Sequence, residues 1–175
     1  MNRAIDRIRD INLALVLITG THDDKGTGLP QQLSLSVELA TKSFEVTTET
    51  AGFKLQTDVA ADFLIEDKFV RPVARLLWRV LKTIDRTLQK QKLQEAQISC
   101  SQGSSELCVT VPGLKLDTQV RSELGHLDIY FKSLGSSVSI DTQDPLIIRI
   151  SLEPLLIHSK LSQTSQAPLQ RTASS

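Results

Sequence analysis

Residues 124–152 read LGHLDIYFKSLGSSVSIDTQDPLIIRISL, and this stretch decides the fold class of the chain. Its apolar residues first recur at a helical spacing, at Leu124, Leu127, Tyr130, Phe131 and Leu134. Gly135 is predicted to end that helix, because glycine tolerates the positive φ that is common just past a helix end. Two strand-like runs follow, Val138–Ile140 and Leu146–Leu152, on either side of the turn residues Asp141–Pro145. The stretch therefore predicts a helix followed by a β-hairpin.

The rest of the chain shows the same two periodicities. They predict helices at Asn2–Thr19, Gln32–Phe44 and Asp67–Lys92, a strand at Phe53–Val59, and a hairpin that joins Ile98–Cys100 to Leu107–Val111. Pro72 is expected in the first turn of the long helix, where a missing N–H has no consequence. This order of elements predicts an α+β fold, a two-layer α/β sandwich in which helices cover one face of a mixed, mostly antiparallel sheet.

The two cysteines, Cys100 and Cys108, flank the expected hairpin turn at Gln102–Ser105. A turn at that place pairs Cys100 with Leu107, which puts Cys108 on the opposite face of the sheet. The pairing register therefore predicts two free thiols, and we expect a reducing, cytoplasmic compartment.

The order helix, glycine, strand, turn, strand in residues 124–152 resembles the C-terminal third of the ATP-binding domain of sensor histidine kinases. The resemblance implies a Bergerat-like ATPase domain at residues 32–158, of the superfamily that histidine kinases share with DNA gyrase. Residues 1–20 resemble the second helix of the dimerisation hairpin that precedes this domain, and residues 21–31 are expected to form a linker. Residues 159–175 are rich in Ser, Gln and Thr, which predicts a disordered tail.

In active members of this family the long helix carries two asparagines, the second of which coordinates the magnesium ion of the bound nucleotide. The resemblance places Thr83 and Thr87 at these two positions. A threonine hydroxyl is shorter than the asparagine side chain and lacks its carbonyl oxygen, so the family's magnesium ligand is missing.

The family's two glycine motifs are also degraded. The aspartate that binds the adenine amino group falls on Val111 or Pro112, neither of which has an accepting side chain, and Gly113 alone survives from that motif. The Gly-x-Gly that cradles phosphates before the last helix is replaced by Arg121–Glu123. Only ten residues separate Gly113 from Leu124, which leaves a short ATP lid.

No phosphoacceptor histidine is recognisable either. His22 lies between Gly20 and Gly26, in a predicted loop, whereas a phosphoacceptor needs a helix. Asp85 and Arg86 are expected on a solvated helix face. The sequence predicts no catalytic residue and no metal site.

The bulk composition excludes several classes of partner. The formal net charge is +0, which gives no electrostatic reason to expect nucleic acid or an anionic membrane. The longest dense apolar run, Leu13–Ile18, is too short to span a bilayer.

These observations predict a catalytically inactive histidine-kinase-like domain that acts as a protein-interaction or regulatory module in two-component signalling, without a cofactor. Its expected contact surface is the N-terminal helix, at Ile5, Ile8, Leu15 and Ile18, and its partner is a second copy, a histidine kinase or a response regulator. The alternative is a divergent domain that still binds ATP and magnesium through Thr83, Thr87 and backbone groups.

Overall fold

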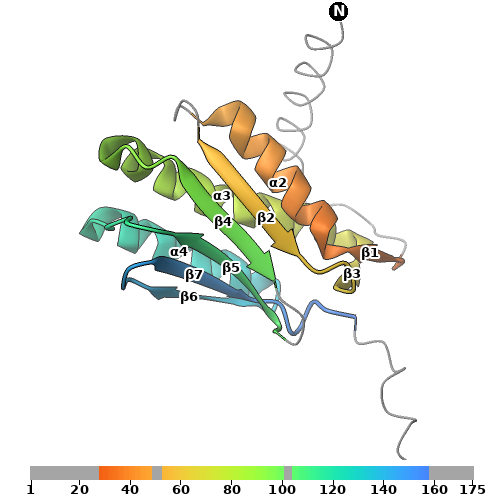
Figure 1. Ribbon diagram of the computed structural model, residues 1–175. Helices are drawn as coiled ribbons and strands as arrows, with labels where there is room; N and C mark the ends of the chain where they lie inside the picture. Colours follow the sequence, from red (N-terminus) through yellow and green to blue (C-terminus); the bar gives the residue numbers. More distant parts are fainter. Residues whose placement is uncertain (1–27, 49–52, 101–103, 158–175) are drawn as a thin grey trace, which may run out of the picture.

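The computed structural model describes residues 28–48, 53–100 and 104–157. A five-stranded sheet has three helices on one of its faces, and a two-stranded sheet lies at one end (Figure 1). The helices are α2 (Leu33–Thr47), α3 (Asp67–Gln91) and α4 (Thr118–Ser133). The main sheet contains β2 (Lys54–Val59), β4 (Glu95–Cys100), β5 (Glu106–Val111), β6 (Ser137–Asp141) and β7 (Leu146–Ser151), and the small sheet pairs β1 (Pro30–Gln32) with β3 (Leu64–Glu66). The predicted two-layer α+β fold is confirmed.

The strand order of the main sheet is β2-β4-β5-β7-β6. Only β2 and β4 are parallel, because α3 carries the chain back across the sheet between them; the other three pairs are antiparallel. The sheet is therefore mixed and mostly antiparallel, as the sequence predicts.

The core lies between the sheet and the helices. Alternate strand residues face the helices and are fully buried, as a period of two requires: Ile98, Cys100, Leu107, Val109, Val111, Leu146, Ile148 and Ile150. The facing stripe of α3 supplies Val73, Leu77, Val80, Leu81, Ile84 and Leu88. Residues of the opposite register, such as Gln97 and Arg149, line the uncovered face of the sheet.

Helix α3 has almost the predicted bounds, but the prediction that Pro72 lies in its first turn is wrong. The N-cap is Glu66, so Pro72 lies in the second turn and leaves the carbonyl of Lys68 without the usual helical N–H. The helix ends where Lys92 takes a left-handed conformation at φ 54°. There the amides of Lys92 and Leu93 donate to the carbonyls of Gln89 and Leu88, which closes the last turn.

Helix α4 begins six residues before the predicted Leu124. Its N-cap is Asp117, whose carboxylate accepts a hydrogen bond from the amide of Val120 at 2.8 Å. Its end follows the prediction: Gly135 has φ +76°, and the amide of Ser136 donates to the carbonyl of Phe131.

The β4–β5 hairpin has the predicted register. Ser99 pairs with Cys108 and Ile98 with Val109, so Cys100 and Cys108 point to opposite faces and both are free thiols. Burial is the main cause that raises the pKa of Cys100 to about 11, and burial also raises the pKa of Cys108.

The small sheet was not predicted. Its strand β1 includes the last two residues of the predicted linker. On β3, Ile65 also forms an antiparallel β-bridge with Leu156. The predicted N-terminal helix, the loop at His22 and the predicted tail at 159–175 lie outside the described residues. No helix among those described is long and apolar enough to cross a membrane.

Candidate functional site in the groove between helices α3 and α4

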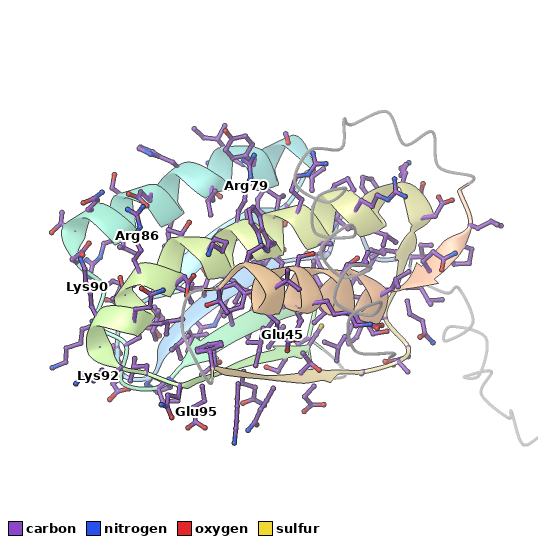
Figure 2. All side chains as sticks on the ribbon, turned by 90° about the horizontal axis from the view of Figure 1, so that it is seen from above. Glu45, Arg79, Arg86, Lys90, Lys92 and Glu95 are labelled. Atoms are coloured by element: carbon purple, nitrogen blue, oxygen red, sulfur yellow. The ribbon has the colours of Figure 1, made fainter. Side chains whose placement is uncertain are left out.

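A groove of about 540 Å³ runs along the outer surface of the helix layer, between α3 and α4. It is lined by Arg79, Lys82, Thr83, Asp85, Arg86 and Gln89 of α3, and by Glu123 and Leu127 of α4. Figure 2 looks down on the helices and shows α3 between α4 and α2, with Arg79 and Arg86 on the side toward α4.

The three positions named from the sequence do not converge on one site. Thr83 lines the groove, but its hydroxyl donates to the carbonyl of Arg79 at 2.9 Å. Thr87 is buried, with 4% of its surface exposed. Gly113 lies in the turn after β5, where its φ of +73° favours glycine and its amide donates to Asp144 Oδ1. Gly113 is therefore explained as a turn residue.

The N-terminus of α4 is the place where the sequence resemblance implies a phosphate site, and here it carries a capping residue of the chain itself. The Asp117 carboxylate accepts from one donor of the first turn, the amide of Val120. The predicted ten-residue lid is wrong, because only four residues, Leu114–Asp117, separate Gly113 from the start of α4. Arg121 and Glu123, predicted to precede the helix, lie inside it, and Glu123 adds a carboxylate to the groove.

Asp85 is a buried carboxylate, which corrects the prediction of a solvated helix face. It is 3% exposed and accepts hydrogen bonds from Thr48 Oγ1 and Lys82 Nζ, both at 2.7 Å. Lys82 also donates to the carbonyl of Thr47 at 2.8 Å. This cluster fastens the end of α2 to the middle of α3, while the neighbouring Arg86 is exposed as predicted.

The groove has a small excess of positive charge. Lys82 and Asp85 pair with each other, which leaves Arg79 and Arg86 as cations and Glu123 as the carboxylate on the wall. Within the described ranges no three His, Cys, Asp or Glu side chains cluster as metal ligands. The groove can hold an anionic group by charge, but it offers no oxygen cage for a divalent cation.

The space between α3 and the β4–β5 hairpin is filled by side chains. Leu77, Leu81 and Ile84 of α3 are fully buried, as are Ile98 and Val109 of the hairpin. An adenine ring could enter between these elements only by displacing packed core residues.

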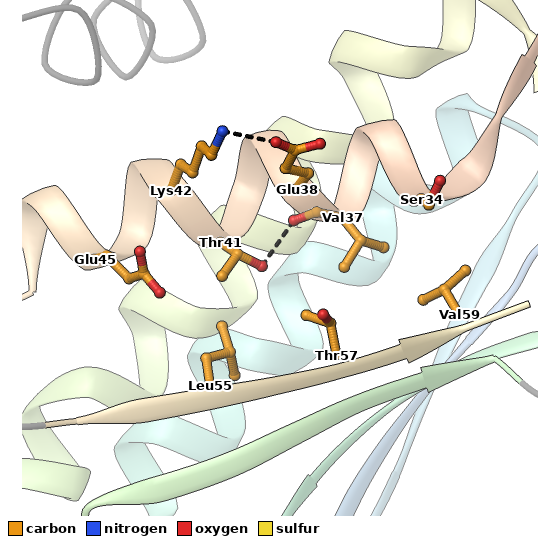
Figure 3. Close-up of a pocket in the computed structure, with 9 residues that line it drawn as sticks. All are labelled: Ser34, Val37, Glu38, Thr41, Lys42, Glu45, Leu55, Thr57 and Val59. Carbon is orange, nitrogen blue, oxygen red and sulfur yellow. Dashed lines mark hydrogen bonds and ion pairs between the residues drawn. The ribbon is translucent and has the colours of Figure 1, made fainter. Parts of the chain in front are cut away.

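A second groove of about 470 Å³ lies between α2 and the edge strand β2 (Figure 3). Several of its polar groups are paired within α2: Thr41 Oγ1 donates to the carbonyl of Val37, and Lys42 pairs with Glu38 at 2.6 Å. The rest of the floor is formed by Leu55, Thr57 and Val59 of β2. This groove has no grouping of side chains that suggests catalysis.

His126 is exposed on α4 and lines neither groove, whereas His22, His158 and the four apolar positions Ile5, Ile8, Leu15 and Ile18 lie outside the described residues. Sequence reasoning missed Asp117, Asp85 and the cations of the groove. Of these, Asp117 had a readable signal, because aspartate is a preferred N-cap.

Comparison with known proteins identifies the fold. No family model and no curated protein sequence matches the chain. Among solved structures, the histidine kinase domain of the blue-light activated kinase EL346 from Erythrobacter litoralis aligns with a TM-score of 0.57 at 12% identity, over 85% of this chain and 73% of that one. The cytoplasmic segment of the histidine kinase QseC aligns with a TM-score of 0.53 at 14% identity, over 86% of this chain and 92% of that one.

A mycobacterial sensor histidine kinase, MprB, aligns with a TM-score of 0.53 at 13% identity, over 71% of this chain and 97% of that one. The chain therefore has a histidine-kinase-like fold, as the sequence resemblance predicts. At this level of identity the likeness concerns the fold.

Proposed function

We propose that the chain is a histidine-kinase-like domain that has lost nucleotide chemistry and acts in two-component signalling through contacts with other proteins, in the cytoplasm. Its partner is a second copy of the chain, a histidine kinase or a response regulator. The histidine-kinase-like fold suggests two-component signalling as the pathway. The changed residues at the expected nucleotide site suggest that the domain acts through protein contacts.

The observation that carries the proposal is the N-terminus of α4. In a phosphate site the free N–H groups of a helix start point at the ligand. Here Asp117 accepts from the amide of Val120, and only six residues link β5 to α4. Thr83 and Thr87 in place of the two asparagines, and packed side chains between α3 and the hairpin, support the same conclusion.

A titration with ATP and magnesium tests the loss of nucleotide binding. We expect no binding heat and no rise in melting temperature. A rise would reveal binding, because a ligand that binds only the folded state must stabilise that state. The control is an active histidine kinase domain under the same conditions, which must give both signals. Phosphorylation of the chain from labelled ATP is also expected to be absent.

One observation favours the alternative of residual nucleotide binding. Thr83 opens on a groove that contains three cations, and triphosphates are anionic. If ATP with magnesium stabilises the chain and Thr83→Ala abolishes this effect, the alternative is correct and the proposal fails.

The proposed interaction surface includes the N-terminal segment. Ile5, Ile8, Leu15 and Ile18 share one face of a predicted helix, and burying each large aliphatic side chain contributes about 1.5–3 kcal/mol. This part of the proposal rests on the sequence pattern, because these residues lie outside those described.

A further inference from the structure

Helix α3 has a continuous row of cations on its solvent-facing side. Seven of its 25 residues are basic and two are acidic. Six of the basic residues follow one another at intervals of three or four, which places them within about 100° of arc on the helix. These residues, called the basic row below, are Arg71, Arg75, Arg79, Lys82, Arg86 and Lys90.

The basic row spans about 28 Å at the helical rise of 1.5 Å per residue. The buried residues of α3, such as Val80, Ile84 and Leu88, occupy the opposite side, so the row is the outward ridge of the central helix. Figure 2 shows this ridge, with Arg79, Arg86 and Lys90 labelled along it. The chain as a whole has no net charge, but this side of α3 carries a concentration of basic side chains.

Part of the basic row is already engaged within the domain. Lys82 pairs with Asp85, Arg79 lies 4.8 Å over the ring of Tyr130, and Arg71 and Arg75 also have contacts. Arg86 and Lys90 are exposed and have no ion pair with any residue that the structure describes. These two cations are available to a partner without the loss of an existing interaction.

Two apolar side chains are exposed on α4, and one of them, Tyr130, adjoins the basic row. Ile129 is 68% exposed and Tyr130 is 48% exposed, and Tyr130 adjoins the row through its contact with Arg79. Tyrosine and arginine are both enriched at the centres of protein interfaces. Glu123 on the same groove would repel a uniformly anionic polymer, whereas a protein can place a neutral or basic side chain against it.

The segments that flank the described residues carry no excess of the complementary charge. Residues 1–27 contain four basic and four acidic residues, and residues 158–175 contain two basic residues and no acidic one. This balance favours an occupant from a partner protein.

From these observations we infer that the ridge of α3 and the adjoining face of α4 form a docking surface for an acidic amphipathic helix of a partner protein. Its carboxylates pair with Arg86 and Lys90, and an apolar side chain packs on Ile129 and Tyr130. This inference rests on the proposed function, because it gives the interaction module its surface and the chemistry of its partner.

The test uses the full chain and a synthetic acidic helix of about 20 residues, long enough to follow the basic row. The peptide has carboxylates at intervals of three or four on one face, one neutral residue among them to lie against Glu123, and two leucines beside them. Binding is measured by fluorescence anisotropy at about 0.15 M salt, where exposed charges more than about 8 Å apart are screened. A scrambled peptide of the same composition, duplex DNA and vesicles of anionic lipid are measured in parallel.

The variant R86E/K90E reverses the two unpaired cations and is expected to weaken binding of the acidic helix by about tenfold or more. The matched control is K54E/R121E, which changes the net charge equally at exposed positions on β2 and on the far flank of α4; its affinity should change by less than about twofold. Ile129→Ala should weaken the acidic helix more than the scrambled peptide. Circular dichroism checks that each variant is folded.

Several results would overturn the inference: equal affinity for the scrambled peptide, tighter binding of DNA or vesicles, or no effect of R86E/K90E. A change in the oligomeric state of the chain caused by R86E/K90E alone would identify a second copy as the occupant and also overturn it. The proposed function is tested separately by the ATP titration, since failure of peptide binding with no ATP binding removes this surface and leaves the inactive domain.

Discussion

Lys92 ends helix α3 in a conformation that suits glycine better than lysine. Its φ is 54°, and its amide and that of Leu93 close the last turn. The same closing turn at the end of α4 uses Gly135, with φ +76°. A left-handed conformation costs an ordinary residue about 1–2 kcal/mol, whereas glycine adopts it freely.

Lys92→Gly is therefore expected to raise the free energy of unfolding by about 0.5–1 kcal/mol, after the larger entropy of the unfolded glycine is subtracted. Gly135→Ala is the reciprocal control and should lower it, because alanine is strained at positive φ. Urea denaturation measures both changes. A loss of stability in Lys92→Gly would mean that the lysine side chain contributes more than the backbone strain.

Asp128 joins the end of α4 to the start of β6. Its carboxylate pairs with Lys132 at 2.7 Å and accepts from the amide of Val138 at 3.1 Å. The hydrogen bond from Lys132 is the main cause that holds the pKa of Asp128 below its usual value, and the bond from Val138 acts in the same direction.

Because the pKa of Asp128 is lower in the folded than in the unfolded chain, its contribution to stability is present above the unfolded value of about 3.9 and is lost as the pH falls through the folded value. The difference in unfolding free energy between the native chain and Asp128→Asn should therefore be largest near neutral pH and shrink in acid. Urea titrations between about pH 2 and pH 7 measure it. A difference that stays constant over this range would show that the charge of Asp128 contributes nothing.

At the scale of elements, the stability of the domain depends most on the contact between α3 and the sheet. Leu77 is fully buried at the centre of this contact. Leu77→Ala should lower the free energy of unfolding by about 2–5 kcal/mol, through lost burial and the cavity that remains. Leu35→Ala is the matched control, because Leu35 is 39% exposed on α2 and should change stability far less. Equal effects in denaturant titration would contradict the assignment of Leu77 to the core.

The bounds of the elements were predictable where the apolar period was long and unbroken. Helix α3 was predicted at Asp67–Lys92 and ends at Gln91, because its buried stripe recurs through every turn. Helix α4 was predicted to begin at Leu124 instead of Thr118, because its first turns present Gln119, Arg121 and Ser122 to solvent and contain a single buried residue, Val120. There the N-cap, not the apolar pattern, marks the start of the helix.

At the scale of the whole molecule, the features that sequence reasoning missed depend on contacts between distant segments. The burial of Asp85 requires Thr48 from α2, 37 residues away, and the β1–β3 sheet pairs two strands of three residues each. The predicted loss of the nucleotide motifs rests on residue types alone, and the start of α4 could also have been read from Asp117 as a preferred N-cap. The basic row was present in the sequence as a spacing of charges, but a net charge of +0 concealed it.

Association through the N-terminal segment is the prediction on which the proposed function depends most. We expect light scattering to show a dimer for the full chain, because an apolar helical face at Ile5, Ile8, Leu15 and Ile18 requires burial. The variant I8E/L15E should be a monomer with the same circular dichroism. If both proteins are monomers of equal stability, this segment is neither an interface nor part of the core.

Both ends of the described chain are fastened to the same few residues. The amide of Gly28 donates to Asp67 Oδ1, and the amide of Ile157 donates to the carbonyl of Leu64. Whatever precedes residue 28 and follows residue 157 is thus tethered at neighbouring points of the domain, so the two flanking segments experience a high effective concentration of each other. An association between the two flanking segments is therefore intramolecular. The folded domain fixes the distance between the points from which the two segments start.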